Sequence, residues 1–115
     1  MRKLFVAAAA VMMLAACGPA PPAQPASGVI IDLVIKDGKV EPQDKRVEVK
    51  VGQPVVLNVS SDEADELHVH SEPEHEFGVL ATADQRFEFI VEVPGQVSVE
   101  SHHLGTTIVK LVVRP

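Results

Sequence analysis

The sequence has no tryptophan, no tyrosine and only one cysteine, Cys17. Beyond residue 16 its aromatic side chains are limited to three phenylalanines, so a stacking platform for sugars or single-stranded nucleic acid is not expected. A single cysteine excludes a disulfide within the chain. No methionine follows Met13, so residues 18–115 contain neither a thiolate nor a thioether that could bind a metal.

Basic residues are also few, with 10 Lys and Arg against 16 Asp and Glu and a formal net charge of −6. Nucleic acid is therefore not an expected partner, because binding to phosphates requires a basic face. The same balance argues against a polybasic surface that docks on a membrane. An acidic surface instead favours cations, with metal ions among them.

Residues 1–16 have the layout of a secretory signal, with Arg2 and Lys3 before an apolar run of small residues. That run is shorter than the roughly 20 residues needed to cross a bilayer. Its end, Leu-Ala-Ala-Cys17, resembles a bacterial lipobox, which implies cleavage before Cys17 and attachment of lipid to its sulfur. We predict a lipoprotein anchored to the cell membrane or outer membrane on the extracytoplasmic side. The alternative is an ordinary secretory signal in which Cys17 has no role.

Loss of Arg2 and Lys3 with the signal would change the net charge from −6 to −8, with histidines neutral. Residues 17–28 then form a lipidated cysteine and a linker rich in Pro and Ala, which favours extended conformations. Residues 29–115 are predicted to form one domain. Such a linker would hold that domain away from the membrane.

Apolar and polar residues alternate with a period of two through most of residues 29–115, and no segment has a helical period. Turn residues such as Asp37-Gly38 and Pro94-Gly95 separate the runs. Residues 71–84 are the longest irregular connection, and we expect a loop there with room for a short helical turn. About seven short strands in one small domain predict an all-β, Greek-key β-sandwich.

All five histidines lie in two short segments; they are His68, His70, His75, His102 and His103. The first three are surrounded by the acidic residues of segment 62–76, and the other two follow a strand predicted at 97–99. His68 and His70 alternate with Leu67 and Val69, which we expect to point into the core. Both imidazoles should therefore leave the outer face of one strand, roughly 6.6 Å apart along it.

The same alternation puts Glu100 and His102 on the outer face of the later strand, while His103 turns with the chain. If the two strands are neighbours, His68, His70 and His102 converge, with Glu100 or Glu66 nearby. Periodicity leaves that pairing open.

Imidazole together with carboxylate, without thiolate, suits Cu(II) or Zn(II). We therefore predict a metal site at these histidines, with His103 and His75 as further candidates; His75 could close over a bound ion from its acidic loop. Two alternatives remain open: the histidines are simply solvated, or they titrate near neutrality and switch an interface with pH.

Several segments resemble the cupredoxin-like superfamily of small Greek-key sandwiches. They are Val51-Gly52-Gln53-Pro54 before an apolar strand, Ser61-Asp62 leading to His68, Pro94-Gly95 leading to His102, and the closing strand 108–113. The run Asp65-Glu66-Leu67-His68-Val69-His70 is similar to a motif of bacterial cupredoxin-like lipoproteins. The resemblance implies the fold, with His68 or His70 at the first histidine ligand and His102 or His103 near the second.

The sequence departs from the blue-copper pattern, in which a cysteine and usually a methionine complete the site. Ser101 stands roughly where that cysteine would be. We therefore expect no blue-copper centre but a copper site, or alternatively a zinc site, used in storage, delivery or resistance. The competing hypothesis is a metal-free domain that recognises a partner protein, such as one of the cell envelope. No enzyme motif is apparent, and we expect no enzyme.

Overall fold

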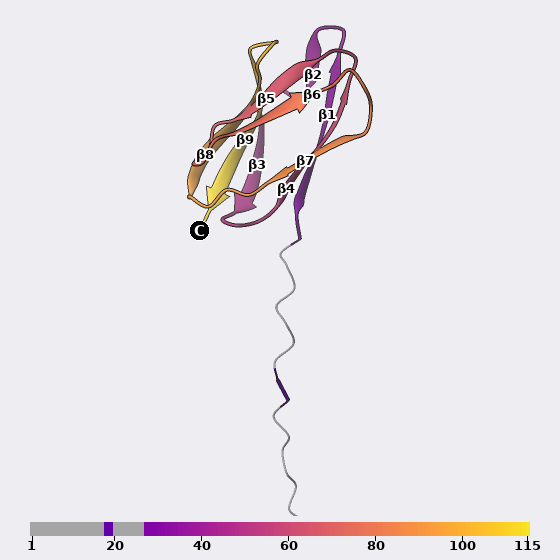
Figure 1. Cartoon of the computed structure of the whole chain (residues 1–115). Helices are drawn as coiled ribbons and strands as arrows, with labels where there is room; N and C mark the ends of the chain where they lie inside the picture. Colours follow the sequence, from indigo (N-terminus) through magenta and orange to yellow (C-terminus); the bar gives the residue numbers. More distant parts are fainter. Residues whose placement is uncertain (1–17, 20–26) are drawn as a thin grey trace, which may run out of the picture.

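The computed structural model describes residues 18–19 and 27–115 (Figure 1). The predicted signal at 1–16, Cys17 and most of the predicted linker lie outside the described residues. Within the described part, no helix is long and apolar enough to cross a membrane.

In the described residues, nine strands form two sheets that pack face to face as a sandwich (Figure 1). The four-stranded sheet has the order β2-β1-β4-β7, made from β2 (Lys39–Glu41), β1 (Val29–Lys36), β4 (Val55–Ser61) and β7 (Gln85–Phe89). The five-stranded sheet has the order β3-β9-β8-β5-β6, made from β3 (Lys45–Lys50), β9 (Thr106–Arg114), β8 (Gly95–Ser101), β5 (Asp65–Val69) and β6 (His75–Val79).

The core lies between the sheets and consists of the inward residues of the alternating strands. Leu33, Leu57, Leu67 and Leu111 are each at most 1% exposed, and they come from four strands of the two sheets. Burial at every second position is what the period of two predicts for strands that are wet on one face. The predicted fold class is therefore confirmed.

One connection differs from the sequence-based expectation. Residues 71–84 hold no helical turn; instead His75–Val79 forms β6, which pairs antiparallel with β5. Its alternation of exposed and inward residues covers only five residues and is flanked by Pro and acidic residues, so the sequence pattern did not indicate a strand. The three-residue strand β2 was not expected either, so the described residues form nine strands against the roughly seven expected.

The first turn follows the prediction closely. Asp37 and Gly38 have φ values of 52° and 70°, and they join β1 to β2. Two consecutive residues in this left-handed region are the requirement of a tight hairpin, and Asp-Gly meets it at low steric cost.

Candidate metal site on the five-stranded sheet

The pairing of β5 with β8 brings the two histidine segments together. The strands run antiparallel, with His68 opposite Glu100 and Val69 opposite Val99. Beyond the end of β8, the His102 amide donates to the Glu66 carbonyl at 2.8 Å, so the contact continues past the strand. Since Leu67 and Val69 are buried, His68 leaves the opposite, outer face of the sheet.

His68 is at the centre of the cluster. Its Nε2 contacts the Glu66 carboxylate and lies 4.0 Å from Glu76 Oε1 on β6. The His102 ring stacks on the His68 ring, with centroids 4.9 Å apart and planes 15° from parallel. The hydrogen bond to Glu66 raises the pKa of His68 above its usual value; partial desolvation of the ring opposes this rise, and nearby glutamates add to it.

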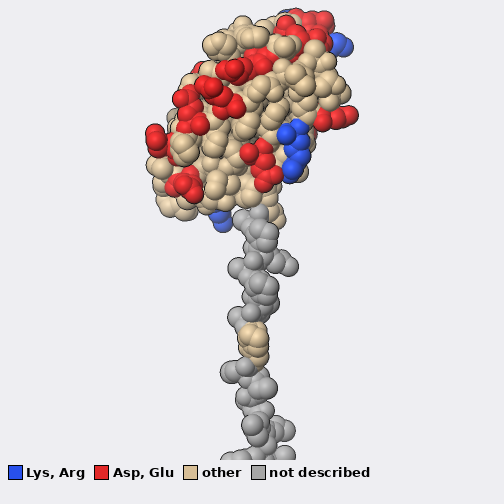
Figure 2. Space-filling model, in the orientation of Figure 1, with Lys and Arg blue, Asp and Glu red and all other residues tan. Residues whose placement is uncertain are grey.

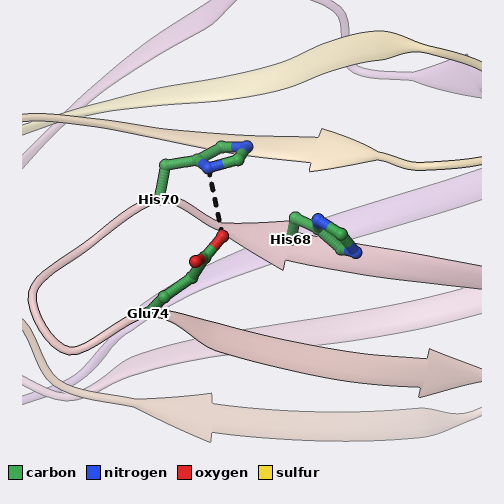
Figure 3. A group of neighbouring side chains, drawn as sticks. All are labelled: His68, His70 and Glu74. Carbon is green, nitrogen blue, oxygen red and sulfur yellow. Dashed lines mark ion pairs between the residues drawn. The ribbon is translucent and has the colours of Figure 1, made fainter.

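His70 lies just after β5 and has two carboxylate partners. Its Nδ1 is 3.3 Å from Glu74 Oε1, and its Nε2 is 3.0 Å from Glu100 Oε2. Figure 3 shows the His70 ring and the Glu74 carboxylate facing each other across the turn that leads to β6, with His68 beside them at the end of β5. The His68 and His70 ring centroids are 6.1 Å apart.

Two overlapping sets of side chains have the composition of a metal site: His68, His70 and Glu74, and Glu66, His68 and Glu76. Within each set the ligand atoms lie within 4.8 Å of one another. Metal–ligand distances of about 2.0–2.2 Å put opposite ligands about 4 Å apart, so small side-chain rotations would bring each set around one ion. Nitrogen and oxygen donors without sulfur fit Cu(II) and Zn(II).

Acidic side chains dominate the surroundings of these histidines. Figure 2 shows a band of acidic residues over the part of the sandwich where β5 and β6 lie, with few basic residues beside it. Among the described residues, the Lys and Arg side chains in ion pairs contact acids elsewhere, at Asp44, Glu48 and Glu88. The carboxylates around His68 and His70 thus have imidazoles as their ion-pair partners.

The other two candidate histidines lie apart from this arrangement. The His103 Nδ1 is 2.9 Å from the Ala64 carbonyl oxygen, and its ring is 6.0 Å from that of His102, at the rim of the cluster. His75 is on the inner face of β6, opposite Val69, and its ring lies 5.6 Å from Phe89 and 6.1 Å from Phe77. The structure therefore does not bring His75 to the cluster.

Ser101 occupies the position that the resemblance assigns to the blue-copper cysteine, and it is 1% exposed. Its hydroxyl donates to the buried carboxylate of Asp65 and accepts the Leu104 amide at 3.1 Å. Asp65 Oδ1 also accepts the His103 amide at 3.0 Å. The two side chains thus form a satisfied polar pair that anchors the turn after β8.

Sequence reasoning missed Glu74 and Glu76 as individual partners. Both follow Pro73 in the segment expected to be a loop, and both reach the histidines because β6 pairs with β5. The available signal was the alternation of His75, Phe77 and Val79, which implies that Glu76 faces the opposite side.

No protein-family model and no curated protein matches the sequence. Solved structures do match. A reduced Cu(I) form of an amicyanin variant is similar with 18% identity and a TM-score of 0.55, over 76% of this chain and 82% of that chain. A multi-copper oxidase from Pediococcus acidilactici has 16% identity and a TM-score of 0.55, over 84% of this chain and 29% of that one.

A heme-copper terminal oxidase dimer is also similar, with 16% identity and a TM-score of 0.54 over 84% of this chain and 76% of that chain. At such identities the likeness establishes the fold alone. The strand order, the two-sheet core and these neighbours together show that the chain has a cupredoxin-like β-sandwich fold.

Proposed function

We propose that this protein is a lipid-anchored, extracytoplasmic metal-binding protein that stores, delivers or sequesters copper, with zinc as the alternative ion. One observation carries the proposal: three histidines from two distant segments converge on the outer face of one sheet among four glutamates. Histidines that are merely solvated would not be expected to cluster in this way.

His68 and His70 are the proposed principal ligands, together with Glu66, Glu74 and Glu76. His102 stacks on His68 and has its own ring at the surface, where it can add a nitrogen ligand. The bound ion would be held by nitrogen and oxygen, which supports a divalent ion rather than the Cu(I) that soft sulfur ligands select. Reversible binding at an exposed face suits a carrier.

Lipid anchoring rests on the sequence. Cys17 follows a short apolar segment of small residues, and the residues after it are uncharged and rich in Pro. Acylation of Cys17 would hold the domain at the membrane through buried methylenes, each worth about 0.8 kcal/mol. The acidic domain would then face the extracytoplasmic space.

We propose a binding protein and not an enzyme. Ser101, next to His102, is the residue that most invites a nucleophile hypothesis. Its hydroxyl is buried and donates to Asp65, while the His102 ring stacks on His68 at the surface. A serine held in this way is out of reach of a substrate, and its hydrogen-bond partner is a buried carboxylate and not the neighbouring histidine.

A metal-free interaction domain is the second candidate, and the other sheet supplies the observation that favours it. Ile30, Val34 and Ile90 are 65%, 48% and 41% exposed on or beside the strands of the four-stranded sheet. Apolar side chains that are exposed together on one sheet would supply the apolar patch that protein-binding surfaces have. An envelope protein is the partner class that the predicted location favours.

The test is a titration of residues 17–115, carrying Cys17→Ser, with Cu(II), Cu(I) and Zn(II). This piece contains the whole hydrophobic core, from Ile31 to Val113. We expect Cu(II) binding of about micromolar affinity or tighter, lost in the triple variant His68→Ala/His70→Ala/His102→Ala. A folded protein that binds none of the three ions would overturn the metal proposal and leave the interaction domain.

A further inference from the structure

Each of the two central histidines has its own pair of carboxylates. His70 lies between Glu74 at 3.3 Å and Glu100 at 3.0 Å. His68 contacts Glu66 and lies 4.0 Å from Glu76. Among the ion pairs of the described residues, no carboxylate serves both rings.

The charge of the cluster also exceeds what one ion can balance. Glu66, Glu74, Glu76 and Glu100 are all partly exposed, with side chains between 40% and 62% accessible. None of the Lys and Arg ion pairs in the described part of the chain involves them. One divalent cation offsets two of these four negative charges, and two cations offset all four.

Building on the proposed metal-binding function, we infer that the outer face of β5 and β6 holds two divalent transition-metal ions side by side. One ion is bound by His68 with Glu66 and Glu76. The other is bound by His70 with Glu74, whose carboxylate oxygen lies 3.3 Å from the Nδ1 of that ring. Glu100 is a positioning residue, because it accepts the remaining ring N–H of His70 and fixes the orientation of the imidazole. Figure 3 shows the His70 and Glu74 pair with His68 to one side.

The chemistry of imidazole separates the two subsites. A neutral imidazole has one nitrogen that carries a proton and one with a free lone pair, so His68 can bind one ion. Its Nε2 faces Glu66 and Glu76, which assigns it to that subsite. A single ion shared by His68, His70 and Glu74 would draw His68 away from Glu66 and leave that carboxylate without a cation.

Native mass spectrometry and calorimetry of residues 17–115 with Cys17→Ser, loaded with Zn(II) and separately with Cu(II), test this inference. We expect two ions per chain in the parent protein. His70→Ala and the double variant Glu66→Gln/Glu76→Gln should each retain one ion. With two Cu(II) ions bound, electron paramagnetic resonance should show a coupled pair that becomes an isolated Cu(II) signal in His70→Ala.

The matched control is Glu48→Gln/Glu88→Gln, which removes two exposed acids that pair with arginines elsewhere on the domain. It should still bind two ions, and loss of one ion there would overturn the inference by showing that net charge alone sets the number. A single ion in the parent protein would also overturn it, while the proposed metal-binding function would stand. Circular dichroism of each variant verifies that the fold is intact.

Discussion

The outer and inner faces of the β5–β6 pair place the same residue types in opposite circumstances. On the outer face, His68 is surrounded by Glu66 and Glu76, and its ring stacks on His102. His75 directly precedes Glu76 on β6, so it lies on the inner face, where its ring packs near Phe77 and Phe89. Its Nε2 is buried with no hydrogen-bond partner among the described residues.

Acidic side chains also differ between the two faces in their exposure and in their partners. Glu76 is exposed and free to meet a cation, whereas Asp65 is 5% exposed and committed to Ser101 and the His103 amide. A polar group on the inner face must find its partners within the protein, because water does not reach it. The imidazoles and carboxylates on the outer face remain accessible to a ligand. The face of the sheet on which a histidine or an acid lies, and not its residue type, therefore decides whether it is available to a ligand or serves only the stability of the fold.

The largest effect we predict comes from removing histidines on one face and then the other. His68→Ala/His70→Ala should weaken Cu(II) binding by more than about 100-fold, since loss of a mere orienting partner already costs about 10–100-fold. His75→Ala should leave the affinity for Cu(II) unchanged, because its ring lies on the inner face. Calorimetric titration measures both. Equal losses in the two variants would contradict the division between the faces.

Asp65→Ala tests the satisfied polar pair of the inner face. The substitution leaves the buried Ser101 hydroxyl and the His103 amide without their acceptor. We expect the free energy of unfolding in urea to fall by about 2–3 kcal/mol. Asp32→Ala, at an exposed acid on β1, should change it by about 0.5 kcal/mol or less. A small effect of Asp65→Ala would show that the pair contributes little to stability.

His75→Phe tests the unsatisfied group on the same face. Phenylalanine keeps a flat ring among Phe77 and Phe89 and removes the buried Nε2. We expect the free energy of unfolding at pH 8 to rise by about 1 kcal/mol, the cost of one unpaired buried polar atom. A decrease would mean that His75 Nε2 finds a partner in solution.

The smallest effect concerns pH in the metal-free protein. The contact with Glu66 raises the pKa of His68 above its unfolded value of about 6.5. Protonated His68 therefore stabilises the fold below that value, and this contribution disappears as the pH rises through the raised pKa. Glu66→Gln should lower the pKa of His68, which an NMR titration of the ring protons measures. An unchanged pKa in this variant would show that Glu66 is not the main cause of the raised pKa of His68.

Much of the fold followed from local pattern. Alternation along 29–36 and 109–113 predicts strands with one buried face, and β1 and β9 confirm it. The cupredoxin-like resemblance carried by Pro94-Gly95 and the segment around His68 agrees with the solved structures that the fold matches. Residues 71–84 were predicted wrongly because a five-residue strand between turns has too few periods to stand out.

The sequence by itself determined the donor chemistry of this protein: imidazoles and carboxylates in two short segments, no sulfur after Cys17, and strands whose period of two puts His68 on a wet face. Only the tertiary structure decided which donors meet. The pairing of β5 with both β8 and β6 joins His102, Glu100 and Glu76 to His68, and it turns His75 inward. Strand partners are chosen by packing of the whole core, and a register shift of one residue exchanges the faces, so no local pattern contains that choice.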